Sequence, residues 1–180
     1  MKKHLAGALV VLGLAVLVPA SAMGASTTAT GTLAAGQLTI APGAAPTFNG
    51  TLDGTDQNLP YTLPTTVTDA RGGQLGWQLT LSGTQFSTGG GTPSTLPANA
   101  STMTGVTSTC VAGSTCTAPT NSVSYPLGLP AASTTKYFNA ATGTGKGKFT
   151  NTPTISVAVP ANSDAGTYTS TLTLSAVSGP

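Results

Sequence analysis

The stretch "DARGGQLGWQLTLSG", residues 69–83, decides the fold class of this chain. Its apolar side chains alternate with small or polar ones, and in an extended strand they would share one face: Leu75, Trp77, Leu79 and Leu81. A strand with one dry face and one wet face is typical of an antiparallel sheet. The stretch therefore predicts a half-buried β-strand around the chain's single Trp.

The run before it, "YTLPTTVTD" at residues 61–69, predicts a second strand with Tyr61, Leu63 and Val67 on one face. Residues 69–73 contain two glycines and read as the hairpin that joins the two strands. Pro64 cannot donate a ladder hydrogen bond, which places this strand at a sheet edge or gives it a bulge.

The same period of two recurs elsewhere, and no stretch keeps a helical period. Further strands are expected in "GQLTIAPG", "PTFNGTL", "TISVAVP" and "TYTSTLTLSAV". Low charge with much Thr, Ser and Gly is also found in disordered chains, but ordered alternation favours a folded domain. We predict an all-β antiparallel sandwich, Ig-like or jelly-roll-like, of about seven to nine strands; a barrel fits almost as well.

The N-terminus predicts export. Lys2 and Lys3 precede an apolar run and then small residues, as in a signal peptide over residues 1–25 with cleavage near 22–25. The alternative is a membrane anchor, but the apolar run at 5–18 falls short of the roughly 20 residues that a span needs. Residues 26–180 then form a single domain with a loop-rich insertion at about 87–147, secreted and without a membrane span.

Charge excludes one class of partner. The chain has six basic and four acidic residues, and loss of Lys2 and Lys3 with the signal leaves four of each sign. No basic patch remains that would bind a phosphate backbone, so nucleic acid is excluded.

Catalytic chemistry is also missing. Beyond residue 25 the sequence has no His and no Glu, which removes His-dependent nucleophilic triads and His-rich zinc sites. Asp53 and Asp56 lack the ligand spacing of a calcium loop and are read as turn residues. We expect no enzyme, no metal and no cofactor.

Cys110 and Cys116, the only cysteines, follow an export signal, so we expect a local disulfide. A redox or metal pair is the alternative. The spacing does not match Cys-x-x-Cys, and no His is left to complete a zinc site.

With these residues in view, the sequence resembles the WxL-domain surface proteins of Gram-positive bacteria. Trp77-Gln78-Leu79 is similar to the Trp-x-Leu element, and the run "VTDARGGQLGW" before it is similar to the family's approach to that motif. "LDGTDQNLPYTL" and the final "GTYTSTLTL" also fit, so the resemblance covers roughly residues 27–177. The family's second Trp-x-Leu is missing, because Leu174 and Ala176 stand there.

The resemblance implies a non-catalytic protein of the cell surface that associates non-covalently with wall peptidoglycan, either alone or within a surface complex. Trp77, Leu79, Arg71 and Asp69 are the candidate ligand-binding residues. The other interpretation of Trp77 is a core side chain, with Arg71 tied to Asp69 or to backbone carbonyls; an inward-facing Trp in an alternating strand favours it.

A second function stays open: a structural subunit of an extracellular filament, assembled by β-strand exchange. The segment "STTATGTLAAG" at residues 26–36 would be the donor strand. Expected partners are therefore peptidoglycan, other surface proteins, or further copies of this chain.

Overall fold

The structure is a computed structural model that describes residues 24–180; the expected signal peptide lies almost wholly outside the described residues. Residues 34–180 form one compact unit that holds every strand of the described chain. Residues 24–33 belong to a separate unit, and there the backbone forms no strand and all side chains are exposed.

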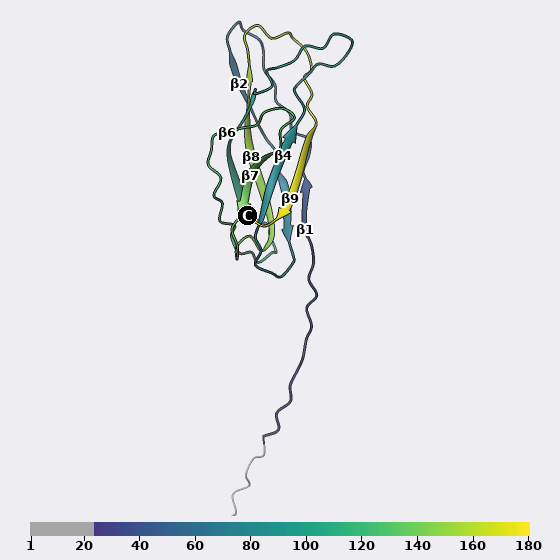
Figure 1. Ribbon diagram of the computed structural model, residues 1–180, viewed down its shortest axis with the longest axis vertical. Coiled ribbons are helices and arrows are strands. Elements are labelled where there is room, and N and C mark those ends of the chain that lie inside the picture. The colour runs from purple at the N-terminus through teal and green to yellow at the C-terminus, as the bar shows by residue number, and fades with distance from the viewer. Residues whose placement is uncertain (1–23) are drawn as a thin grey trace, which may run out of the picture. The chain divides into compact units, whose positions relative to one another are not determined.

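Nine strands make up the compact unit, and no helix occurs within residues 24–180. The strands are β1 (Leu38–Pro42), β2 (Gln57–Thr62), β3 (Thr65–Asp69), β4 (Trp77–Gly83), β5 (Ser101–Cys110), β6 (Leu127–Gly128), β7 (Thr135–Ala140), β8 (Gly147–Val159) and β9 (Leu172–Ser178). They form two antiparallel sheets, one of six strands and one of three (Figure 1). The predicted all-β sandwich is confirmed.

The six-stranded sheet is organised by β8, which is 13 residues long. One edge of β8 pairs with β5, and the other pairs first with β3 and then with β2. Pro153 lies where the partner changes from β3 to β2, and its carbonyl accepts the N–H of Leu63 from that gap. The missing donor of Pro153 faces the same side, where no ladder bond is needed.

The three-stranded sheet has β4 at its centre. β7 pairs with one edge of β4, with a register shift between Leu79 and Thr80, and β9 pairs with the other edge over the whole length of β4. In Figure 1 the teal β4 and the yellow β9 run side by side.

The core fills the space between the sheets, because each sheet turns one face of its alternating strands inward. Trp77, Leu79 and Leu81 of β4 are 0–3 % exposed, as the alternation predicts. They pack with buried side chains of the other sheet: Tyr61, Val67, Met103, Phe149, Ile155, Val157 and Val159. Burial of one such apolar side chain stabilises the fold by about 1.5–3 kcal/mol.

The predicted hairpin at residues 69–73 is wrong. β3 lies in the six-stranded sheet and β4 in the three-stranded sheet, so residues 70–76 cross between sheets. The reason is edge occupancy: β3 has β1 and β8 as neighbours, and β4 has β7 and β9. Neither strand has a free edge for the other.

Other local expectations also change. Leu75 is 63 % exposed and lies before β4, because Gly76 has a φ of 67° that interrupts the alternation. Residues 46–52 form no strand, although Phe48 still packs on Tyr61. The run at 57–69 divides at Leu63 and Pro64 into β2 and β3. Of these two, β2 is the edge strand, since β8 is its one ladder partner.

The segment 87–147 contributes more than loops. It holds β5, β6 and β7, and these strands bury Met103, Tyr137 and Phe138 in the core. The strands expected near the C-terminus are found: β8 contains the alternating run 155–159, and β9 alternates from Leu172.

Candidate functional site

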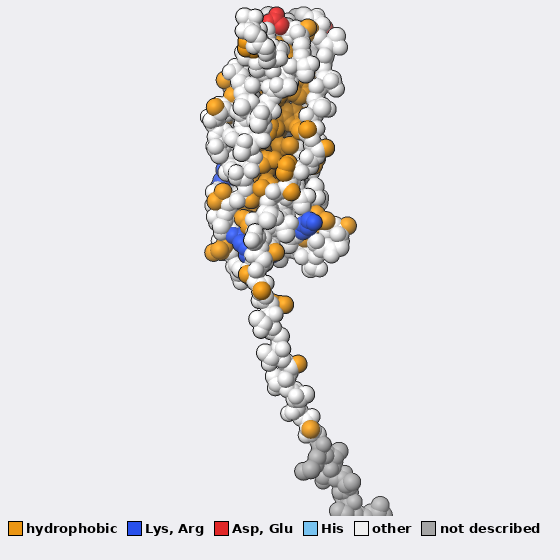
Figure 2. All heavy atoms as spheres, turned by 90° about the vertical axis from the view of Figure 1, so that its right-hand side faces the viewer, with side chains coloured by type: hydrophobic (Ala, Val, Ile, Leu, Met, Phe, Trp, Pro, Cys, Tyr) orange, Lys and Arg blue, Asp and Glu red, His pale blue; other side chains and the backbone are white. Residues whose placement is uncertain are grey.

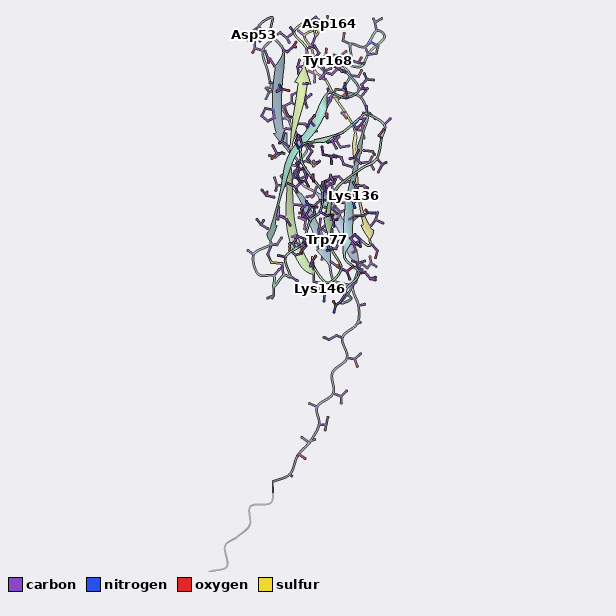
Figure 3. The ribbon with its side chains drawn as sticks, turned by 60° about the vertical axis from the view of Figure 1, so that its left-hand side comes forward. Asp53, Trp77, Lys136, Lys146, Asp164 and Tyr168 are labelled. Atoms are coloured by element: carbon purple, nitrogen blue, oxygen red, sulfur yellow. A yellow bond between two sulfur atoms is a disulfide. The ribbon has the colours of Figure 1, made fainter. Side chains whose placement is uncertain are left out.

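Trp77 opens β4 at one end of the sandwich, next to Lys146 (Figure 3). Its side chain is 0 % exposed, and its ring lies between Phe138 at 5.8 Å and Phe149 at 6.4 Å. The indole N–H donates to the carbonyl oxygen of Gly145 over 2.8 Å, which satisfies its single polar atom. The interpretation of Trp77 as a core residue is confirmed.

Two glycines make this packing possible. A Cβ on Gly145 would lie 2.7 Å from the indole nitrogen and 2.4 Å from the Cβ of Ala140. A Cβ on Gly76 would lie 2.3 Å from the carbonyl oxygen of Ala140. Both glycines have positive φ, 72° and 67°, so any other residue would bring backbone strain as well as a clash. The loops can therefore close directly over the indole.

Arg71 and Asp69 form a clamp beside this packing. The guanidinium donates from Nε to Asp69 Oδ1 at 2.8 Å and from Nη2 to Oδ2 at 2.9 Å. Nη2 also donates to the carbonyl oxygen of Gly76 at 2.7 Å, and Nη1 donates to Ser178 Oγ at 2.6 Å. A bidentate arginine–carboxylate pair fixes orientation as well as distance.

The clamp joins elements from both sheets. Asp69 ends β3 in the six-stranded sheet, while Gly76 precedes β4 and Ser178 ends β9 in the three-stranded sheet. The side chain of Asp69 is 6 % exposed and that of Arg71 is 18 % exposed. Because the hydrogen bonds from Arg71 favour the charged carboxylate, they lower the pKa of Asp69. The pair therefore holds the two sheets together at this end while both groups stay ionised.

A disulfide closes another loop at the same end of the sandwich, between residues 110 and 116. Cys110 and Cys116 are bonded, with an S–S distance of 2.00 Å, and the described chain has no free cysteine. Cys116 packs against the core, and Gly147 at the start of β8 leaves room for its sulfur. Thr117 then exchanges backbone hydrogen bonds with the loop that covers the indole, through Gly145 and Lys146. The predicted disulfide is confirmed.

The charged residues of the compact unit are distributed unevenly between its two ends, although Asp69 lies with Arg71 at the end near Trp77. Asp53 and Asp164 lie at the end far from Trp77, whereas Lys146 lies beside it (Figure 3). Figure 2 shows the same division, with red side chains at the upper end and blue ones in the lower half. Lys146 is close enough to Asp69 to help lower its pKa. We name Arg71, Lys146 and Lys148 the basic end.

Exposure divides the candidate ligand-binding residues into two pairs. Trp77 and Leu79 have no exposed surface, so they support the end from within, while Arg71 reaches the surface over the nearly buried Asp69. Gly145 and Ser178 complete the arrangement. No sequence pattern indicates them, because they lie 68 and 107 residues from their partners.

Two further observations describe residues 24–180. No group of three or more His, Cys, Asp or Glu lies close enough to hold a metal ion there. The same residues contain no helix long and apolar enough to cross a membrane.

Comparison with known proteins agrees with this geometry. No curated protein and no solved structure gave a significant match to the chain. The family model of the WxL domain, described as surface cell wall-binding, matches residues 23–180 and so covers all nine strands. WxL domains are non-catalytic modules that attach to the wall without a covalent bond. The chain belongs to this family and is a cell-wall-bound surface protein.

Proposed function

We propose that this chain attaches to the wall by binding peptidoglycan with its basic end. The family match carries the proposal at the level of wall attachment. The choice of surface rests on the uneven distribution of charge. Three of the four cations of the described chain gather where Trp77, the clamp and the disulfide stiffen the loops, and two of them, Lys146 and Lys148, lie outside the Arg71–Asp69 pair.

Charge supports peptidoglycan as the ligand. Stem peptides of peptidoglycan carry free carboxylates, which ammonium and guanidinium groups bind by charge-assisted hydrogen bonds. Lys148 is exposed and Lys146 is half-buried, so both ammonium groups are within reach of solvent. Leu75 and Gln74, exposed on the neighbouring loop, offer an apolar and an amide contact beside them.

In this proposal Trp77 and Leu79 act through the surface above them. The Trp77 side chain holds Gly145, the residue before Lys146, by its hydrogen bond, and the Arg71 clamp holds the start of β4. Loss of Trp77 would therefore weaken wall binding by loosening the loops rather than by removing a ligand contact.

Sedimentation of the purified protein with wall sacculi tests the proposal. Lys146→Glu with Lys148→Glu should reduce the sedimented fraction at least tenfold, and added salt should weaken wild-type binding because exposed charges are screened. Lys136→Glu makes the same charge change at an exposed position of β7, outside the basic end, and should bind as the wild type does. Undiminished sedimentation of the Lys146/Lys148 double variant would exclude this surface.

A further inference from the structure

The sandwich is open along one side of its far half. A groove of about 1100 Å³ lies between residues 42–52 and β2 on one side and residues 164–174 on the other. Figure 2 looks into it and shows apolar side chains along its floor. That floor is made by apolar side chains of both sheets and of the loops beside them: Ile40, Leu59, Leu63, Leu96, Leu172 and Leu174.

Strand edges are free beside this groove. β9 has β4 as its one ladder partner in the described chain, and β1 has β3 alone. β1 lies close to β9, so the part of β9 that borders the groove is the part at Leu172 and Leu174. Leu172 and Leu174 of β9 are only half-buried, although they face the core side of their sheet. Free edges next to an uncovered apolar floor are what a sandwich presents when one strand is missing.

The groove suits an uncharged strand better than a sugar. Its aromatic rings contact one another: Phe48 stacks on Tyr61 at 5.9 Å and meets the edge of Phe86 at 5.4 Å. Burial raises the pKa of Tyr61 to about 12, so its hydroxyl stays neutral. Asp164 is the one charged residue among the lining residues. Tyr168 also lines the groove, without an aromatic partner, but no cation is available there for a charged glycan.

The chain itself carries a segment of matching chemistry. Residues 26–35 have no charged side chain and alternate in the order that a strand requires. One face would carry Ala29, Gly31, Leu33 and Ala35, and the other would carry mainly threonines. Leu33 is 99 % exposed, the highest value among the exposed large apolar side chains. The segment and the groove therefore both expose apolar surface.

Length and attachment also fit. A strand of seven or eight residues spans about 25 Å, which is the length of a strand such as β9 with its seven residues. Gly36 donates its N–H to the carbonyl oxygen of Ala70 at 2.8 Å, which fixes the segment's end to its own six-stranded sheet. None of residues 26–35 lies in a strand of the described chain.

We propose that the groove accepts residues 26–35 of a second copy of this chain as an added strand. Leu33 enters the apolar floor, and the backbone of the segment pairs with the free edge of β9. Each copy has one donor and one acceptor, so the contact is head-to-tail and extends into a filament unless it closes into a ring. The proposal is independent of wall attachment.

Sedimentation velocity of the mature protein over a range of concentrations tests it. The wild-type mass should rise with concentration, whereas Leu33→Asp, which lacks a working donor, should stay monomeric. Leu174→Asp lacks a working acceptor and should also stay monomeric. A mixture of these two variants retains one functional pair and should stop at the dimer. Thr32→Asp and Val177→Asp add the same charge on the opposite faces and should associate as the wild type does.

Cysteine trapping identifies the contact. Leu33→Cys and Leu174→Cys, placed on separate chains, should form a covalent dimer when mixed and oxidised. The proposal is overturned if Leu33→Asp associates normally, if the wild type stays monomeric throughout, or if both cysteines on one chain yield a crosslinked monomer. Leu33→Asp lies outside the compact unit, so a folding defect cannot explain its result. It should also keep its binding to sacculi, which separates this test from that of the wall proposal.

Discussion

Inward-facing apolar side chains are sealed from solvent at one end of the sandwich and open to it in the other half. At the basic end, loops close over Trp77 and leave it 0 % exposed, held by Gly145 and the Arg71 clamp. In the far half, Leu172 and Leu174 face a groove that nothing in the described chain fills. Apolar alternation therefore marks which side chains point inward, whereas the loops decide whether the interior is sealed.

The contrast also suits the two ends to different binding partners. A sealed end with fixed charges can present a constant surface to a rigid polymer. An open apolar groove between free strand edges favours a partner that brings its own backbone hydrogen bonds. If the basic end is rigid and the groove is unfilled, equivalent substitutions in the two regions should differ in their effect on stability.

The largest effect is expected from Trp77→Ala. Loss of a fully buried indole should lower the free energy of unfolding by about 3–5 kcal/mol through lost transfer and cavity terms. Urea denaturation measures the change, with Val177→Ala on the outer face of β9 as the control. In the wild type this single Trp should emit at short wavelength and resist iodide quenching. Ready quenching, or an unchanged midpoint in the variant, would contradict the sealed end.

A matched pair of leucines compares the two regions directly. Leu81 and Leu174 are register partners on β4 and β9, yet Leu81 is 3 % exposed and Leu174 borders the groove. Leu81→Ala should destabilise by about 2–5 kcal/mol, and Leu174→Ala by less than about 1.5 kcal/mol because its site is already open. Thermal unfolding of dilute protein measures both. Equal losses would mean that the groove is filled in solution.

Arg71→Ala removes the clamp while leaving Asp69 nearly buried. We expect a loss of about 2–3 kcal/mol, since a charged acceptor then lacks its partner. Arg71→Lys should recover only part of it, because an ammonium cannot make the bidentate pair. The denaturation midpoints of the wild type and the two variants measure these losses. Full recovery of stability in Arg71→Lys would show that charge alone suffices.

The disulfide is expected to contribute less. Replacing Cys110 and Cys116 by Ser should lower stability by no more than roughly 2 kcal/mol, the chain-entropy value for so short a loop. The fold should persist, and thiol labelling of the oxidised wild type should find no free thiol. An unfolded double variant would mean that the loop beside Gly145 cannot form without the bond.

The smallest effect is a pH dependence. Arg71 lowers the pKa of Asp69 in the folded state, so this carboxylate stabilises the fold above its unfolded value of about 3.9. The contribution is lost as the pH falls through the lowered pKa. Wild-type stability should therefore drop more between pH 5 and about pH 2 than that of Asp69→Asn. Parallel pH profiles of the two proteins would show that the Asp69–Arg71 pair does not contribute to the loss of stability in acid.

Much of the fold could be predicted from alternation alone, because β4, β8 and β9 each turn one side inward. Sheet membership could not, since Leu79 pairs with Ala176 nearly a hundred residues later. β7 could not be predicted from alternation for a different reason. Four successive residues, 137–140, are buried, so the period of two is absent there. The loop at 121–125 covers its outer face, where the Asn121 side chain accepts the N–H of Asn139.

In the candidate site, too, local contacts could be predicted from the sequence and long-range contacts could not. The pairing of Arg71 with Asp69 was foreseeable because the two residues lie two positions apart. The partners that make the clamp a link between sheets, Gly76 and Ser178, depend on how β4 meets β9. The groove was unforeseeable, because no local pattern reports that a neighbouring strand is missing.

The position of β8 along the chain has a consequence for biogenesis. β2, β3 and β5 all ladder on this strand, and β4 waits for β9, the final strand. A chain that leaves the cell N-terminus first exposes its early strands long before their partners arrive. Contacts between such distant residues form slowly. Most of the six-stranded sheet therefore forms only after β8 has been translocated. A product truncated ahead of Gly147 would leave β2 with no ladder partner, and would leave β3 with β1 alone and β5 with β6 alone.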